Sequence, residues 1–180
     1  MDAQRSPILA IPFSLREASA NRGLARAACE IAPDDFDLLL VDDLPMFSED
    51  HEVKGEEPSV RSACEFREAV RSAPALLLCT PEYDAYPPGM LVNAFNWLSR
   101  EPDPPLKGKK VAVAGAAAGF RGSRRSQAHV RQLLETIGAR TIEHHYYLQI
   151  GDNFNSTGDL DNEGARERFG EFLNAVSAST

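Results

Sequence analysis

Short apolar runs that alternate with helical patterns constrain the fold of this 180-residue chain more than any other feature. Five apolar runs have the length and composition of strands, at residues 7–11, 36–41, 75–80, 110–115 and 141–148. Helical patterns follow them, at residues 22–31, 59–72, 89–100, 123–137 and 162–178. Strands that alternate with helices indicate βαβ units and a parallel sheet.

Two of the runs, ALLLCT at 75–80 and VAVAG at 111–115, show no alternation of polar and apolar residues. This pattern is typical of strands that are covered on both faces. The sequence therefore predicts an α/β fold: a flavodoxin-like, doubly wound, five-stranded parallel sheet of order 2-1-3-4-5, with helices on both faces. Nothing marks a second domain, so residues 1–180 are expected to form a single flavodoxin-like domain.

The charge balance argues against several classes of partner. Lys and Arg total 19 against 27 Asp and Glu, which gives a net charge of −8. An acidic surface disfavours binding to nucleic acid or to an anionic membrane. No apolar run approaches the ~20 residues of a membrane span, and no signal peptide is evident. The three cysteines are widely spaced and predict neither a disulfide framework nor a metal site, so a cytoplasmic protein is expected.

In such a sheet, ligands bind beyond the carboxyl ends of the strands, which selects the loops at residues 12–21, 81–88 and 116–122. The first loop carries Ser14, Arg16, Ser19 and Asn21 just ahead of a helix. Hydroxyl, amide and guanidinium groups at a helix N-terminus suit a phosphate. The alternative is an ordinary loop in which Ser19 or Asn21 caps the helix.

The other two loops are also unusual in composition. The second carries Tyr83 and Tyr86 among prolines, a stiff platform that could flank a flat ring, with Glu82 and Asp84 as acceptors. A tight turn with locally packed tyrosines, or a subunit contact, is the alternative. The third reads GAAAGFRG at 115–122, and its glycines allow a close approach of the backbone to a ligand.

Together these loops resemble a known family. FSLREASANR at 13–22, LPMFSED at 44–50, PEYDAYPPGMLVNAFNW at 81–97 and GAAAGFRG at 115–122 are similar to motifs of the NADPH-dependent FMN reductase family. That family includes quinone, azo-dye and chromate reductases, and the resemblance runs over residues 8–176. It implies an FMN cofactor, NADPH or NADH as electron donor, and a quinone, azo compound, flavin or metal ion as acceptor.

The resemblance also implies roles for individual residues. The FMN phosphate would be held by Ser14, Arg16, Ser19 and Asn21. The edge of the isoalloxazine ring would be lined by Pro81, Glu82, Tyr83 and Asp84. The pyrimidine side of the ring would be approached by Gly115 and Gly119. Because the flavin carries the chemistry, no catalytic side chain is assigned. A homodimer or homotetramer is expected, as is typical of the family.

Several positions depart from the family pattern. Pro12 lacks a backbone N–H group, and Phe13 puts a ring where the family has glycine beside the phosphate. Asp84 adds a negative charge near the ring, and Tyr86 adds bulk. These departures favour an alternative, a flavodoxin-like binding or regulatory protein that has lost FMN or turnover.

Three further expectations concern the helices and the last strand. Asn93 and Trp97 are expected to pack structurally rather than to contact the flavin. The aromatic stretch 144–147 and the helix that carries Phe95 and Trp97 are expected to be exposed and covered by a second subunit. Arg121, Arg124 and Arg125 form either a clamp for the 2′-phosphate of NADPH or an ordinary basic surface cluster.

Overall fold

The computed structural model describes residues 6–52, 60–100 and 102–180. Its centre is a parallel sheet in the order β2-β1-β3-β4-β5, so the predicted flavodoxin-like topology is confirmed. The strands are β1 (Ile8–Pro12), β2 (Phe36–Leu38), β3 (Ala75–Cys79), β4 (Lys110–Ala117) and β5 (Arg140–Gln149). The second strand is shorter than predicted, because only three of its residues pair with its single neighbour, β1.

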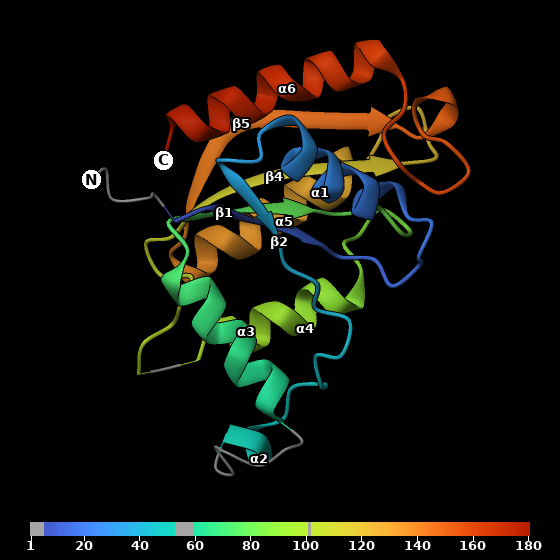
Figure 1. Ribbon diagram of the computed structural model, residues 1–180. Coiled ribbons are helices and arrows are strands. Elements are labelled where there is room, and N and C mark those ends of the chain that lie inside the picture. The colour runs from blue at the N-terminus through green and yellow to red at the C-terminus, as the bar shows by residue number, and fades with distance from the viewer. Residues whose placement is uncertain (1–5, 53–59, 101) are drawn as a thin grey trace.

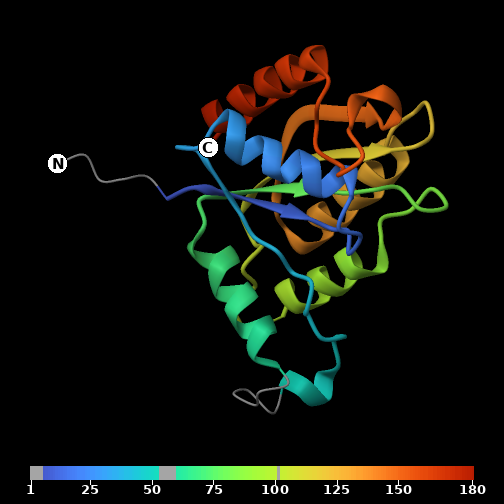
Figure 2. The ribbon, with the colours of Figure 1, turned by 45° about the vertical axis from the view of Figure 1, so that its right-hand side comes forward.

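Helices cover both faces of the sheet, as Figures 1 and 2 show. One face packs against α1 (Ala20–Ile31) and α6 (Glu163–Ala178). The other packs against α3 (Arg61–Ser72), α4 (Gly89–Leu98) and α5 (Arg124–Ile137). A short helix, α2 (Glu49–Glu52), lies in the long connection after β2. A 3₁₀ turn, η2 (Gly151–Asn153), follows β5. The predicted helix start at residue 59 lies outside the described residues.

The central strand β3 is buried along its whole length, which is why its sequence shows no polar alternation. Successive side chains of a strand point to opposite faces. Leu77 therefore enters the layer under α1 and α6, whereas Leu76 and Leu78 enter the layer under α3, α4 and α5. Each buried leucine contributes about 1.5–3 kcal/mol through removal of its surface from water.

The helix ends follow their local sequence. Ser19 caps α1 by accepting a hydrogen bond from the backbone N–H of Asn21, and Asn162 caps α6 in the same way through Ala165. Gly138 ends α5 in the left-handed conformation, with a φ of 83°. A left-handed residue at this position is least costly for glycine, so the predicted end of this helix is confirmed.

The helix α4 is locked to the segment before α2. Both Trp97 Nε1 and Asn93 Nδ2 donate hydrogen bonds to the carbonyl of Pro45, at 2.8 and 2.9 Å. The Asn93 side-chain oxygen accepts from the backbone N–H of Phe47 at 2.8 Å. The structural role predicted for Asn93 and Trp97 is therefore confirmed, but the predicted exposure of Phe95 and Trp97 is wrong. The rings of Phe95 and Trp97 are buried by the chain itself and need no second subunit.

The last strand also differs from its prediction. Tyr146 is buried against Phe169 and Phe172 of α6, and its hydroxyl donates to the carbonyl of Ala165 at 2.9 Å. Burial raises the pKa of this phenol to about 12. The predicted exposed stretch 144–147 is therefore wrong for Tyr146, because α6 crosses that face of β5. Among the described residues, no helix is long and apolar enough to cross a membrane.

Candidate functional site

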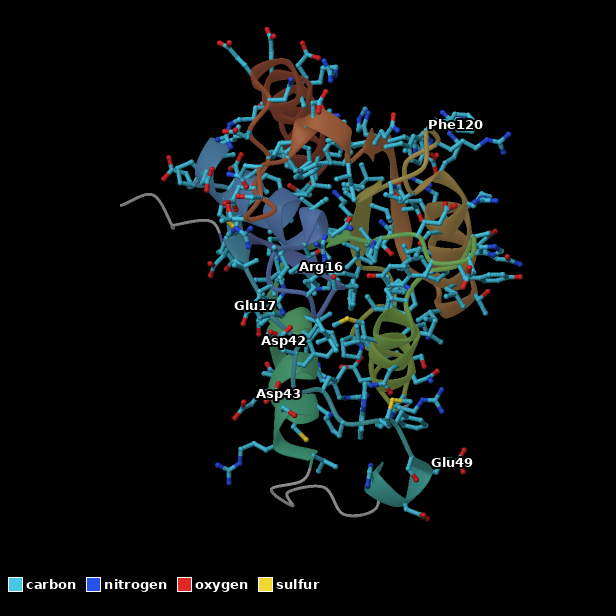
Figure 3. All side chains as sticks on the ribbon, turned by 90° about the vertical axis from the view of Figure 1, so that its right-hand side faces the viewer. Arg16, Glu17, Asp42, Asp43, Glu49 and Phe120 are labelled. Atoms are coloured by element: carbon cyan, nitrogen blue, oxygen red, sulfur yellow. The ribbon has the colours of Figure 1, made fainter. Side chains whose placement is uncertain are left out.

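Three loops meet at the carboxyl edge of the sheet, which faces the viewer in Figure 3. They enclose a cavity of about 260 Å³. Its walls come from the loop after β1, the loop after β3 and the end of β4, with one residue that follows β5. The lining residues are Ser14, Arg16, Ser19, Ala20, Asn21, Pro81, Glu82, Tyr83, Ala116, Ala117, Ala118 and Ile150.

The floor of this cavity is the N-terminus of α1. Ser14 and Ser19 are both buried and both line the cavity, and the Ser19 hydroxyl also accepts the capping hydrogen bond from the N–H of Asn21. The loop that carries Ser14 is held by Arg22, which donates to the Ser14 carbonyl at 2.8 Å and pairs with Asp42 at 2.5 Å. The first turn of α1 contains no acidic residue. Two hydroxyls at the positive end of a helix dipole fit a phosphate monoester.

Arg16 supplies the positive charge of the cavity wall. It is exposed on the carboxyl edge, near the centre of the view in Figure 3. Within residues 6–52, 60–100 and 102–180, the Arg16 guanidinium has no hydrogen-bond or ion-pair partner, unlike Arg22 and Arg26. An unpartnered guanidinium beside two hydroxyls completes a donor set that suits a phosphate.

Asn21 lies in the lining, but its side-chain amide is already engaged. Its Nδ2 donates to the carbonyl of Ala116 at 3.0 Å, and its Oδ1 accepts from the N–H of Ala116 at 2.9 Å. This double hydrogen bond is buried and ties α1 to the end of β4. The side chain predicted as a phosphate ligand thus fixes the distance between two walls of the cavity.

The two departures at the end of β1 do not obstruct the cavity. The side chain of Phe13 is fully buried in the layer under α3, α4 and α5, and its backbone N–H donates to the carbonyl of Cys79 at 2.9 Å. The expectation that this ring stands where the phosphate binds is wrong, because the alternation of the strand sends it to the core. Pro12 is the last residue of β1 and pairs with Cys79.

The loop after β3 forms a two-residue hairpin. Tyr83 and Tyr86 exchange two backbone hydrogen bonds, of 3.0 and 2.8 Å. Between them, Asp84 and Ala85 have φ angles of 48° and 73°. Positive φ at both central residues is the geometry of a type I′ turn. The Tyr86 ring stacks on His129 of α5, with centroids 4.4 Å apart.

Glu82 fastens this hairpin to α5. Its carboxylate pairs with the Arg125 guanidinium at 2.7 Å and accepts from the backbone N–H groups of Arg125 and Ser126 at 2.9 and 3.2 Å. Burial raises the pKa of Glu82, but these hydrogen bonds outweigh it, so the pKa lies below its usual 4.5. The Glu82 side chain is thus directed at the N-terminus of α5 and holds the hairpin against it.

A second, wider cavity of about 750 Å³ shares Glu82, Ala117 and Ala118 with the first. The hairpin forms one wall, through Asp84 and Ala85. The loop after β4 and the start of α5 form the other, through Gly119, Phe120, Arg121, Gly122 and Arg125. This volume is within the ~300–1,000 Å³ of typical ligand pockets.

The glycines of the loop after β4 have different roles. Gly115 is buried and lines neither cavity. A Cβ at this position would lie 2.1 Å from the Thr80 carbonyl oxygen, so only glycine fits there. Gly119 lines the wider cavity with open space around it. Gly122 has a φ of 56°, and a Cβ there would lie 2.8 Å from the Leu148 carbonyl oxygen. Of the two glycines predicted to approach the ring, Gly119 is part of the wider cavity lining, whereas Gly115 is part of neither lining.

Sequence reasoning missed part of the site. Ala117 and Ala118 line both cavities, and Ala116 and Ile150 line the smaller one. Beneath the edge lies a buried polar cluster in which Thr80 and Ser126 are 3.2 Å apart and Gln127 donates to Ser123. The sequence carried no signal for Ile150, which reaches the cavity only because β5 lies next to β4.

Among the described residues, neither the cysteines nor any acidic cluster forms a metal site. In the part of the chain that the structure describes, no group of three or more His, Cys, Asp or Glu side chains could hold a metal ion. The Cys79 thiol is buried in β3, and burial raises its pKa well above its usual value. This thiol is therefore inert at neutral pH.

Comparisons with known proteins agree with this geometry. The model of the family described as NADPH-dependent FMN reductase matches residues 6–152. An NAD(P)H-dependent FMN reductase of Pseudomonas aeruginosa is 35% identical over 173 residues, covering 94% of this chain and 92% of that protein. A quinone reductase of Escherichia coli is 32% identical over 188 residues, covering 97% and 98%.

A solved structure is similar over the same length. FerB from Paracoccus denitrificans, described as a flavoenzyme NAD(P)H:(acceptor) oxidoreductase, superposes with a TM-score of 0.85. It shares 25% sequence identity, and the match covers 96% of each chain. The likeness therefore includes all three loops of the carboxyl edge.

Proposed function

The chain belongs to the NADPH-dependent FMN reductase family, and we propose that it is an FMN-dependent oxidoreductase that passes electrons from NAD(P)H to quinones. FMN is the cofactor of this family and NAD(P)H its electron donor. The choice of quinones as acceptors draws on the relatives that are named quinone reductases.

One observation carries the proposal for this chain. One cavity is lined by buried Ser14 and Ser19, by Arg16 with its unpartnered guanidinium, and by the N-terminus of α1. That cavity shares its wall with a wider one. A phosphate bound in the first would leave the attached ring in the second, between the hairpin residues Asp84 and Ala85 and the loop at residues 117–122.

The residues of this chain would bind the FMN phosphate and orient the flavin ring. Ser14, Arg16 and Ser19 would hold the phosphate, and Asn21 would keep α1 and β4 at the spacing that this requires. The Glu82 to Arg125 pair would hold the hairpin beside the ring. When bound, the flavin supplies the hydride and electron transfer itself, so no side chain need act as acid or base.

The alternative, a binding protein without flavin, loses its main physical support. It rested on Pro12, Phe13 and Tyr86 as obstacles to FMN, and Pro12 is part of neither cavity lining. The Phe13 ring lies in the core, and the Tyr86 ring stacks on His129. Neither side chain lines the phosphate cavity.

A homo-oligomer in the cytoplasm is part of the proposal. Leu15, Tyr83, Tyr86 and Phe120 are large exposed apolar side chains, and all four lie on loops of the carboxyl edge. Covering such a rim is a common reason for subunit association. The chain has only three cysteines, widely spaced in the sequence, which suits a reducing compartment. A light-scattering mass of one subunit at micromolar concentration would contradict the oligomer.

Two measurements test the function. Flavin-fluorescence titration should give saturable FMN binding, and the loaded protein should oxidise NAD(P)H in the presence of a quinone. Arg16→Ala should weaken FMN binding by about 1.5–3 kcal/mol, the range of a charge-assisted hydrogen bond. Arg140→Ala, at the opposite edge of the sheet, removes the same charge and should leave the affinity unchanged.

The outcomes separate the parts of the proposal. Unchanged affinity in Arg16→Ala would remove this residue from the site and leave the activity standing. A wild-type protein that does not bind FMN even at high concentration would overturn the proposed function itself.

A further inference from the structure

Three arginines follow β4, and the structure gives each a different environment. The Arg125 guanidinium is neutralised by Glu82 at 2.7 Å. The Arg124 guanidinium lies 4.9 Å from the centroid of the Tyr147 ring, which also receives Arg131 at 5.8 Å. Arg121 alone of the three lines the wider cavity without an acidic partner among the described residues.

The residue before Arg121 is an exposed aromatic ring. Phe120 is 80% exposed, the largest exposed fraction among the large apolar side chains described. The Arg121 guanidinium lies 5.2 Å from the centroid of this ring. The ring of such a pair can stack on a heterocycle while the guanidinium, which has no acidic partner among the described residues, binds an anion.

The backbone holds this pair in place. The N–H of Gly122 donates to the carbonyl of Gly119 at 2.9 Å, so Phe120 and Arg121 are the two central residues of a tight turn. Gly122 anchors the turn, because its positive φ brings it against the backbone of Leu148. The turn therefore presents both side chains at the mouth of the cavity.

Charged side chains are distributed unevenly around the carboxyl edge. Figure 3 shows Glu17, Asp42 and Asp43 on one side of Arg16 and Phe120 on the other. Of the charged residues that line the wider cavity, Glu82 and Arg125 cancel, which leaves Asp84 on the hairpin and Arg121 on the opposite wall. An anionic group that enters this cavity would be attracted toward the Arg121 side.

We propose that Phe120 and Arg121 bind the adenosine end of the electron donor and select NADPH over NADH. Phe120 stacks on the adenine ring, which both donors share. Arg121 binds the 2′-phosphate, which only NADPH carries. This inference rests on the proposed function, because it assumes that a nicotinamide dinucleotide enters the wider cavity.

Steady-state kinetics with the FMN-loaded protein test the two roles separately. In Arg121→Ala, the KM for NADPH should rise about tenfold through loss of a charge-assisted contact, while the KM for NADH should stay within about twofold. Phe120→Ala should raise both KM values by a similar factor. Arg124→Ala is the matched control, because its side chain lies on Tyr147 outside the cavity lining, and it should change neither.

A binding measurement keeps this test independent of turnover. Adenosine 2′,5′-bisphosphate and 5′-AMP would be titrated calorimetrically into wild-type protein, Arg121→Ala and Arg124→Ala. The bisphosphate should bind more tightly than 5′-AMP to wild-type protein and Arg124→Ala, and the difference should disappear in Arg121→Ala.

Three results would overturn the inference. The first is equal binding of the bisphosphate to wild-type protein and Arg121→Ala. The second is loss of the NADPH preference in Arg124→Ala, which would move the anion site to Tyr147. The third is equal loss for both donors in Arg121→Ala. A protein that binds the bisphosphate at Arg121 but does not oxidise NAD(P)H would refute the proposed function alone.

Discussion

Ala85 occupies a backbone conformation that is costly for a residue with a Cβ. Its φ is 73°, and its neighbour Asp84 has a φ of 48°, as a type I′ hairpin requires. The left-handed region costs a non-glycine residue about 1–2 kcal/mol, and glycine populates it freely. Glycine in turn makes the unfolded chain more flexible, at a cost of about 0.5–1 kcal/mol.

The substitution Ala85→Gly should therefore stabilise the protein by about 0.5–1 kcal/mol net. For a chain of this length, that corresponds to a rise in Tm of about 1–4 °C. Thermal unfolding followed by circular dichroism measures it. The control is Ala128→Gly, at an exposed position inside α5, which should lower the stability by about 1 kcal/mol. A Tm that falls in Ala85→Gly would refute the assignment of strain to this turn.

Three other predictions concern the walls of the site. Asn21→Ala leaves the N–H and carbonyl of Ala116 unpaired in a buried position and should lower the free energy of unfolding by about 2–4 kcal/mol, measured by urea titration. Gly122→Ala should destabilise by at least about 1–2 kcal/mol because of its positive φ, whereas Gly119→Ala, in open space, should be nearly neutral; equal Tm values would contradict this. The pKa of Glu82 lies below 4.5 in the folded state, so its carboxylate stabilises the fold fully above pH 4.5, and this stabilisation is lost as the pH falls through the folded pKa. Glu82→Gln should therefore weaken the dependence of the free energy of unfolding on acid, measured in unfolding experiments from about pH 6 down to about pH 3.

The sequence by itself determined the layered architecture and most of the smaller cavity at the carboxyl edge. The runs of β3 and β4 are apolar because both faces of these strands are covered, so their burial and parallel pairing could be predicted. Ser14, Arg16 and Ser19 lie together in one short loop ahead of α1, and local order alone brings them to one cavity. Because these residues are close in the chain, they can be assigned to one site without knowledge of the tertiary packing.

The tertiary structure alone decided where side chains point when their partners are distant in the chain. Asn21 binds the backbone 95 positions away at Ala116, and Glu82 reaches Arg125 43 positions away. Phe13 follows the alternation of β1 into the core, although its motif suggested the phosphate site. Arg121, Arg124 and Arg125 are indistinguishable in sequence, but a tight turn, the Tyr147 ring and the Glu82 carboxylate give each its own environment. These contacts depend on how strands and helices pack, because only packing brings groups with no local pattern within hydrogen-bond distance.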